Sequence, residues 1–549
     1  MSSIFGILNT GRQALSVQQS ALSTVGNNIS NSSTEGYSRQ RTVLETLSYG
    51  GVKLTGIQRM RDEFIAARLL TSNAKLGYSS TQSTALQQLE TAVDESDESG
   101  LTVSMQAFFD ALQDLSASAD GTTEREAFLS QATQLLASFR SVSDQITQIR
   151  GQLDEQVQQQ VADVNTITTA IAKLNAEIGA QDQSLETNTN TGLNALLDQR
   201  DQLISDLSSI VPTRTMTGEN GELTIFCGTF PLVNGSSSQT FELQPDAGNQ
   251  GYSNVVIDDL GGQRDISGDL STGSLGALLA TRDGQAREML DQVDRLASTL
   301  TRDMNAVHRS GYGLDGGTGR DLFTGLSATV SIGLVNKGAV TGATGAIVDE
   351  SALTFDNYEV RFTSGTSYDV IDTTTGGTVS TGNAWTTGQA IDIAGMRLTL
   401  SGGAPAAGDA FEINAYSGMS ARIELSTAVK NDSRAVAAGA TSAAGDNENA
   451  LAMIALATTL TMGNPPAETY ETYYNSMRTR LATQVNIATT AEAQEETTQT
   501  QLNSLQESVS GVSLDEEAVN LIQFQRAYQA ASKVISATDE MLQTLLAMI

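Results

Sequence analysis

The stretch SLDEEAVNLIQFQRAYQAASKVISATDEMLQTLLAMI, residues 513–549, carries a single apolar stripe to the last residue of the chain. Its apolar positions recur at alternating steps of three and four, the heptad spacing of a helix that packs lengthwise against another helix. Ser513 can cap this helix, and the acidic residues 515–517 suit its first turn. The stripe consists of Leu521, Phe524, Tyr528, Ala531, Ile535, Thr538, Leu542, Leu545 and Ile549.

The opposite end of the chain has the same pattern, which predicts a helix over residues 2–30. A helix with one apolar stripe needs a partner. The two ends can form an intramolecular coiled coil that closes a bundle, or they can order only when many copies assemble. The N-terminal stripe consists of Ile4, Leu8, Gly11, Leu15, Gln18, Leu22, Val25 and Ile29.

Between the two ends, helical and β-type sequences alternate. Residues 60–205 and 275–308 have helical periodicity, and helix is expected again from Ala421 onward. Short β-type runs occupy residues 212–269 and 325–418. The pattern predicts an α+β multidomain protein, with a long helical bundle or coiled coil built from both chain ends and two β-rich insertions. The expected domains are 1–50 with 508–549, a helical bundle of 51–205 with 275–322 and 420–507, and β-rich insertions at 206–274 and 323–419.

Composition argues against several classes of protein. The chain has 63 acidic and 31 basic side chains, and its net charge of -32 would repel nucleic acid and anionic membranes. No apolar run is long enough for membrane insertion, and the start does not read as a cleaved signal peptide. Cys227 is the only cysteine and His308 the only histidine. We therefore expect no enzyme activity, no metal site and no cofactor.

Two further motifs are better explained without a ligand. The run from Gly311 to Gly316 fits a dinucleotide-binding pattern, but it follows a predicted helix rather than a strand, so a helix-ending turn is expected. The acidic run DESDESG, residues 94–100, lacks the spacing of a calcium-binding loop and is expected to be a solvated link between helices.

The polar turn after the first helix carries a family resemblance. The run QALSVQQSALSTVGNNISNSSTEGYSRQR, residues 13–41, resembles the N-terminal signature of the axial proteins of the bacterial flagellum. Its end, Ser38-Arg39-Gln40, is similar to the form found at the hook–filament junction, and residues 510–546 resemble the C-terminal segment of the same proteins. Weaker similarities lie at 304–323 and 398–413. Residues 32–35 are Ser-Ser-Thr-Glu where the family usually has Asn-Thr-Pro, which predicts a less rigid turn.

The resemblance implies a structural adaptor that joins the hook to the filament. It implies a secreted protein located in the extracellular flagellum and exported through the flagellar type III apparatus. An alternative is another axial protein, such as the hook protein, although the long helices after residue 60 argue against it. A second alternative is an adhesin or an enzymatic β insertion carried on an axial frame.

The resemblance also implies partners and sites. The partners are further copies of the chain in a ring-like homo-oligomer, the hook protein, a second hook–filament junction protein and a dedicated export chaperone. The first helix would line the flagellar tube, and the chaperone would contact Phe524, Tyr528 and Ile535. The expected subunit-interface residues are Leu8, Leu15, Leu22, Val25, Ile29, Tyr37, Arg39, Arg41, Leu521, Phe524, Tyr528, Ile535, Leu542 and Leu545.

Overall fold

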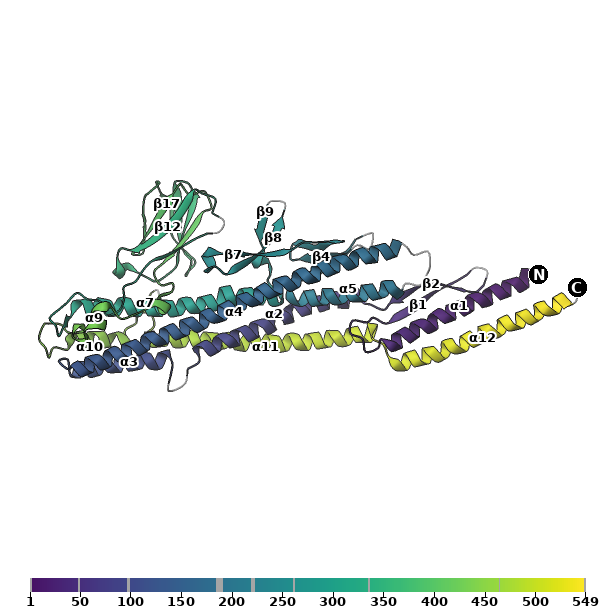
Figure 1. Cartoon of the computed structure of the whole chain (residues 1–549), viewed down its shortest axis with the longest axis horizontal. Coiled ribbons are helices and arrows are strands. Elements are labelled where there is room, and N and C mark those ends of the chain that lie inside the picture. Colours follow the sequence, from purple (N-terminus) through teal and green to yellow (C-terminus); the bar gives the residue numbers. More distant parts are fainter. Residues whose placement is uncertain are drawn as a thin grey trace.

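The computed structural model shows an elongated molecule in which long helices run side by side (Figure 1). Both termini lie together at one tip, and two β-rich regions stand on one side of the helices. The structure describes residues 2–47, 50–95, 99–183, 191–218, 223–259, 262–333, 336–463 and 465–547.

A bundle of long helices, here called the body, forms most of the molecule. Apolar side chains at three- and four-residue steps on these helices meet in two clusters, one within the bundle and one that α4 and α5 share with the first β insertion. On the longest helix Phe128, Leu135, Phe139 and Ile146 are completely buried. The body helices are α2 (Glu63–Val93), α3 (Leu101–Ala117), α4 (Thr122–Gln183), α5 (Thr191–Ile210), α7 (Ala286–Ser310) and α11 (Tyr470–Ser510).

The first β insertion packs directly against the body. It contains two antiparallel sheets, with strand orders β3-β4-β5-β6 and β7-β8-β9. Cys227 is buried in the core that these strands share with α4 and α5, where burial raises its pKa to about 12. The strands are β3 (Thr213–Thr217), β4 (Leu223–Cys227), β5 (Phe230–Asn234), β6 (Ser237–Ser238), β7 (Phe241–Pro245), β8 (Ser253–Asp259) and β9 (Gly262–Asp265).

The second β insertion has a core of its own and stands away from the helices (Figure 1). Its sheets have the orders β11-β18-β13-β14-β15 and β12-β17-β16, and Phe362, Trp385 and Phe411 meet between them. The strands are β11 (Thr329–Ile332), β12 (Val340–Ile347), β13 (Tyr358–Ser364), β14 (Ser367–Asp372), β15 (Gly377–Ala384), β16 (Ile391–Ile393), β17 (Met396–Gly402) and β18 (Ala410–Asn414).

The chain returns to helix differently after each insertion. After the first, α6 (Gly273–Ala280) continues through a π-helical turn, Thr281–Gln285, into α7, close to the expected range. After the second, helix resumes at Met419, close to the expected Ala421, but glycine, asparagine and proline between residues 439 and 466 break it into short elements. Only short elements precede α11: α8 (Met419–Arg422), α9 (Thr427–Asn431), β19 (Ala437–Gly439), paired with β10 (Tyr312–Gly313), and α10 (Glu448–Ala455).

The two ends of the chain form what we call the terminal unit. Helix α1 (Ser2–Ser30) packs against α12 (Leu514–Ala547). They are antiparallel, because Gly11 lies beside Ile535 while Asn28 bonds Glu517. The unit also contains a hairpin that the sequence analysis missed, β1 (Gln40–Thr46) and β2 (Val52–Arg59). The boundary expected between residues 50 and 51 falls inside this hairpin, and the division into domains remains a prediction.

Candidate assembly interface

The seam between α1 and α12 follows the expected stripes but is only partly buried. The closest approach is at Gly11, where an added Cβ would lie 2.8 Å from Ile535 Cγ1. Val25 is buried, and Tyr528 is exposed. The side chain of Leu545, and all of Ile549, lie outside the described residues. The remaining expected apolar residues are half-buried: Leu8, Leu15, Leu22, Ile29, Leu521, Phe524, Ile535 and Leu542.

Small and polar residues form the most buried face of α1. Val17, Ala21, Thr24 and Asn28 are each at most 4 % exposed. They recur at steps of three and four beside the expected stripe, where α1 also contacts the hairpin. The sequence analysis missed this face because three of its four residues are not large apolar residues.

Helix α12 also carries apolar side chains that lie outside the seam and are exposed. Val519 is 64 % exposed and Ile522 is 52 % exposed, and Val534 and Met541 are almost half exposed. We call these four residues the outer stripe. Nothing within the described part of the chain covers it, so a partner that packs on α12 would find an apolar surface there.

A buried polar cluster joins the two chain ends where α1 meets α12. Glu517, only 1 % exposed, accepts bonds from Arg39 Nε at 2.9 Å and Asn28 Nδ2 at 3.1 Å. Asn28 Nδ2 also donates to the Gln40 carbonyl at 2.9 Å, and its Oδ1 accepts from Tyr37 Oη at 2.8 Å. We call Asn28, Tyr37, Arg39 and Glu517 the polar junction. It fixes the polar turn, the hairpin and α12 relative to one another.

Two of the three expected interface residues of the turn, Tyr37 and Arg39, therefore make contacts within one chain. Burial raises the pKa of Tyr37 to about 12, with added repulsion from Asp198 and Glu517. Tyr37 is therefore a neutral hydrogen-bond donor at neutral pH. Arg39 bonds both Glu516 and Glu517, whereas Arg41 is exposed. The turn itself is ordered by local bonds, including Thr34 N to the Asn31 carbonyl at 3.0 Å. Whether these residues also meet a neighbouring subunit remains a prediction.

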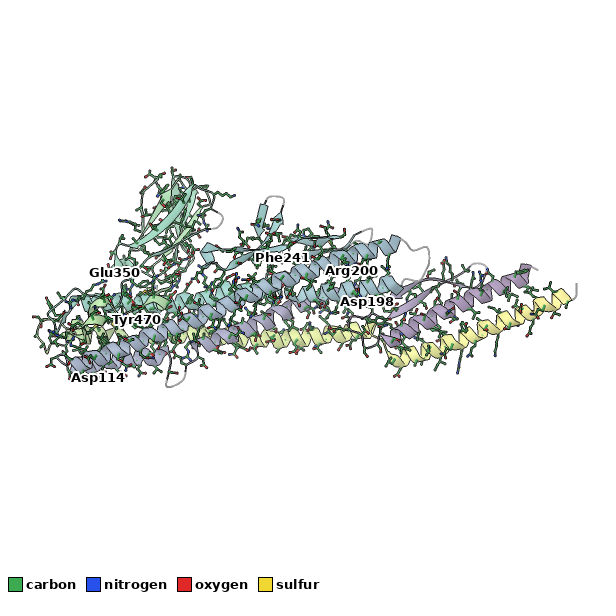
Figure 2. All side chains as sticks on the ribbon, in the orientation of Figure 1. Asp114, Asp198, Arg200, Phe241, Glu350 and Tyr470 are labelled. Carbon is green, nitrogen blue, oxygen red and sulfur yellow. The ribbon has the colours of Figure 1, made fainter. Side chains whose placement is uncertain are left out.

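Ion pairs connect the terminal unit to the body. Arg59 on β2 lies 2.7 Å from Asp198 and 2.9 Å from Asp201, both on α5, and Arg61 lies 2.8 Å from Asp201. Asn194 Nδ2 donates to the Ile57 carbonyl at 3.1 Å. Figure 2 places Asp198 where the body ends and the terminal helices begin. These contacts set the angle between the two regions.

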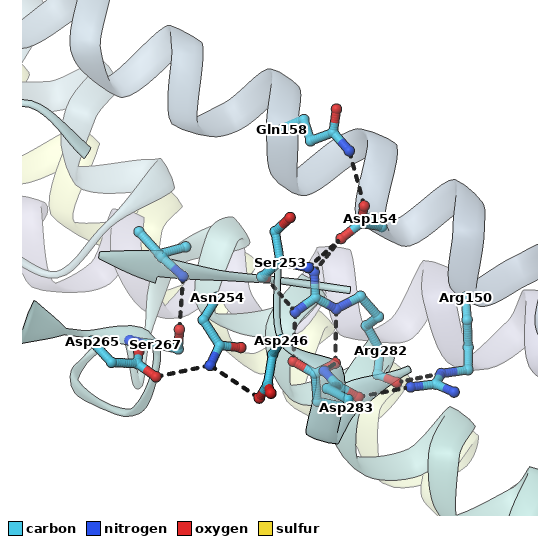
Figure 3. Close-up of polar contacts among 12 residues, drawn as sticks. Arg150, Asp154, Gln158, Asp246, Ser253, Asn254, Asp265, Ser267, Arg282 and Asp283 are labelled. Atoms are coloured by element: carbon cyan, nitrogen blue, oxygen red, sulfur yellow. Dashed lines mark hydrogen bonds and ion pairs between the residues drawn. The ribbon is translucent and has the colours of Figure 1, made fainter. Parts of the chain in front are cut away.

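A separate polar network fixes the first β insertion to the body (Figure 3). The π-helical turn directs the buried Arg282 toward Asp154 on α4, and Arg282 also donates to the Ser253 carbonyl at 2.8 Å. Arg150 on α4 donates to the Arg282 carbonyl at 3.0 Å and to Asn249 Oδ1 at 3.0 Å. The sequence analysis missed this network, because its members are far apart in the chain.

The other motifs have structural roles. His308 is buried, with Nδ1 2.7 Å from the Arg320 carbonyl, and its Nε2 accepts from Ala437 N at 2.9 Å. Glu95, in the acidic run 94–100, accepts from Leu101 N at 2.6 Å and so caps α3. Residues 96–98 of that run lie outside the described residues. Within the described chain there is no cluster suited to a metal ion, and no helix has the length and apolarity to cross a membrane.

Comparisons with known proteins agree with the arrangement of the ends. The family model "Flagella basal body rod protein" matches residues 8–37, and "Flagellar basal body rod FlgEFG protein C-terminal" matches residues 506–548. Between them, "Flagellar hook-associated protein FlgK helical domain" matches residues 86–323. These matches show that both ends and the helical middle of the chain are similar to flagellar axial proteins.

The similarity extends along nearly the whole chain. Flagellar hook-associated protein 1 of Salmonella typhimurium is 28% identical over 98% of this chain and 99% of its own length. The proteins of the same name from Escherichia coli and Bacillus subtilis are 27% and 26% identical, over 98% and 99% of this chain. These findings confirm the resemblance that the termini indicated, and they specify it as one to flagellar hook-associated protein 1.

A solved structure supports the fold. The flagellar hook junction protein FlgK from Burkholderia pseudomallei superimposes with a TM-score of 0.71, at 20% identity. It covers 81% of this chain and 100% of its own. The α+β multidomain architecture with a long helical frame is therefore confirmed.

Proposed function

We propose that this protein is the structural adaptor that joins the hook of the bacterial flagellum to its filament. One observation carries the proposal: two terminal segments of flagellar axial type lie side by side as an antiparallel pair, on a chain similar throughout to hook-associated protein 1. The role is structural, and the place of action is the extracellular hook–filament junction.

The charge distribution supports assembly through the terminal unit. Residues 1–59 and 511–549 carry seven basic and seven acidic side chains, so the net charge of -32 lies entirely on residues 60–510. Like charges oppose the close packing of identical copies. Neutral terminal units can pack together in a ring without net repulsion, whereas the acidic bodies favour positions that point apart.

The outer stripe supplies the apolar surface for this packing. Its partners would be further copies of the chain, the hook protein below the ring and the second junction protein above it. Before export, a dedicated chaperone would bind Phe524, Tyr528 and Ile535. Because Phe524 and Ile535 are half-buried in the seam, such a chaperone would take the place of α1. Transfer through the flagellar type III apparatus would precede the pairing of α1 with α12.

The alternatives have less support. The curated relatives described above are hook-associated proteins rather than hook proteins, which favours the junction over the hook itself. An adhesive or enzymatic role for the β insertions has no specific observation in its favour.

The proposed function can be tested in bacterial cells from which the gene for this protein has been deleted. These cells should keep their hooks but release filament protein into the medium, and the wild-type gene should restore attached filaments. A variant with Val519→Asp and Val534→Asp should be secreted but should not restore filaments, because two charges enter a packed apolar surface. The matched control, Gln525→Asp with Ser536→Asp on exposed flanks of the same helix, should restore them. Filaments built with the outer-stripe variant would contradict assembly through this stripe.

A further inference from the structure

An open cavity of about 800 Å³ lies where the body meets the terminal unit. We call it the junction groove. Helices α2, α5 and α11 line it, and the polar turn of residues 31–38 forms one edge. Ile65, Leu69 and Ile204 contribute apolar surface to its lining. Such a groove, part apolar and part polar, can receive a protein segment.

The lining of the junction groove is strongly acidic. It contains five carboxylates and a single basic residue, Arg61, which pairs with Asp201. Within the described chain, the other four carboxylates form no ion pair. These four carboxylates are solvent-exposed and have no cationic partner, so the groove favours a basic occupant. The four unpaired carboxylates are Glu35, Asp62, Asp206 and Glu507.

Basic side chains without partners occur on the β1–β2 hairpin. Arg41 on β1 and Lys53 on β2 are exposed, and neither side chain has a hydrogen bond or ion pair among the described residues. Neighbouring arginines are different, since Arg39 pairs with Glu516 and Glu517, and Arg59 pairs with Asp198 and Asp201. Arg41 and Lys53 are therefore free to bind carboxylates elsewhere.

The hairpin is held away from the junction groove of its own chain. Arg39 N donates to the Ser510 carbonyl at 2.9 Å, and Met60 N donates to the Arg39 carbonyl at 2.8 Å, so the base of the hairpin is fixed. From this base the strands extend along α1, away from the body (Figure 1). A hairpin that enters a junction groove must then belong to another molecule.

We propose that the junction groove binds the face of the β1–β2 hairpin that carries Arg41 and Lys53, with Glu45 opposite Lys53, of a second copy of this chain. The inference rests on the proposed self-assembly at the flagellar junction. The two surfaces differ, so the contact is head-to-tail, the kind that forms a ring where the rotation between copies closes. Four carboxylates without ion pairs, of which Asp62 and Asp206 accept hydrogen bonds within the chain, would meet two cations without partners, which fixes the rotation between neighbours as well as adding attraction.

Charge reversal tests the contact in cells that lack the gene. Arg41→Glu with Lys53→Glu should reduce attached filaments at least tenfold, and so should Asp206→Lys with Glu507→Lys. All four substitutions together should restore filaments, because the charges are again complementary. The matched control, Lys173→Glu with Lys430→Glu on exposed positions of the body, should leave filaments unchanged. Each purified monomer should melt near the wild-type temperature, since every substituted side chain is exposed.

Cysteine cross-linking tests proximity directly. In isolated flagella, Lys53→Cys with Glu507→Cys should give a ladder of covalent multimers under oxidation, and each single variant should not. The native Cys227 is completely buried and should not contribute. Three outcomes would overturn the inference and leave the proposed function standing. The first is normal filaments with Arg41→Glu and Lys53→Glu, and the second is the absence of filaments when all four charges are reversed. The third is flagella that contain the double-cysteine protein but give no ladder of multimers. If the wild-type gene failed to restore filaments in the deletion strain, that result would contradict both this inference and the proposed function.

Discussion

The body and the terminal unit are both built from long helices with apolar stripes, but they bury those stripes to different extents. In the body, Phe128, Leu135 and Phe139 are completely buried because each helix has several neighbours. In the terminal unit, Phe524 and Ile535 are only half-buried, and the outer stripe has no neighbour. The same periodicity therefore gives a closed core where helices surround one another and an open seam where only two helices meet. The open seam leaves surface for further copies.

The largest difference between the two regions should appear when one large side chain is truncated in each. Phe128→Ala should destabilise the body by about 3–5 kcal/mol, since it removes a ring that packs against Phe108 and leaves a cavity. Phe524→Ala should cost only about 1 kcal/mol in the monomer, because solvent already reaches this ring. Urea unfolding of the purified monomers measures both values. Equal losses would show that the terminal seam is as closed as the body core.

Replacing glycine by alanine in each region tests the same difference in packing between the body and the terminal unit. An added Cβ at Gly77 in α2 would lie 2.2 Å from the Ser209 carbonyl oxygen, so Gly77→Ala should destabilise the body by about 3 kcal/mol. At Gly11 the close atom is Cγ1 of the half-buried Ile535, a side-chain rather than a backbone atom, so Gly11→Ala should cost less than Gly77→Ala, about 1 kcal/mol. Gly151 in α4 has open space around it, and Gly151→Ala is the control, expected to stabilise by about 0.5–1 kcal/mol. Equal losses of stability for Gly11→Ala and Gly77→Ala would show that the seam between α1 and α12 cannot adjust to an added methyl group.

Periodicity was sufficient to predict the frame of the molecule. The heptad stripe from Leu521 to Leu542 does face α1, and the two β insertions occur within a few residues of the expected ranges. These features are local, so one stretch of sequence contains all the information that they need. The hairpin after Gln40 was also visible, since its strands flank the Gly50-Gly51 pair, a turn signal that the analysis did not use.

The contacts that build the candidate interface could not be predicted in this way. Glu517 looked like an ordinary first-turn acid, and only the fold places it beside Asn28 and Arg39, which are almost the whole chain away. The same is true of Arg150 and Arg282, whose partnership depends on a π-helical turn that the helical pattern did not reveal. Long-range polar contacts depend on the registers of several elements at once, and periodicity fixes only one element at a time.

The polar junction predicts a smaller effect, confined to the terminal unit. Glu517→Gln should weaken the attachment of α12 by about 1–2 kcal/mol, because the buried charge that receives bonds from Arg39 and Asn28 is lost. Hydrogen exchange should become faster along α12 and stay unchanged in the body. Glu516→Gln is the control, since its side chain is 62% exposed, and it should change exchange little. Faster exchange throughout the body would show that the two regions unfold as one unit.

Acid pH should act on the body through two buried groups with opposite effects. Burial lowers the pKa of His308, whose Nε2 accepts a bond from Ala437 N. Unfolded histidine takes up a proton near pH 6.5, so the stability that neutral His308 contributes is present above about 6.5 and is lost as the pH falls toward the folded pKa. Burial instead raises the pKa of Asp294 to about 6. Its contribution is present at acid pH and is lost as the pH rises through about 6.

Because the two contributions partly cancel, the wild-type body should change in stability by less than about 1 kcal/mol between pH 7 and pH 5. His308→Gln removes the acid-sensitive group but keeps a donor and an acceptor, so the body of this variant should be more stable at pH 5 than at pH 7. Asp294→Asn should do the reverse, because it leaves His308 opposed, within the described part of the body, only by Asp291, whose pKa burial also raises. The terminal unit contains no histidine. Urea unfolding at the two pH values measures each change, and hydrogen exchange assigns it to a region. If His308→Gln left the pH dependence of the body unchanged, the buried imidazole would not be the group that responds to acid.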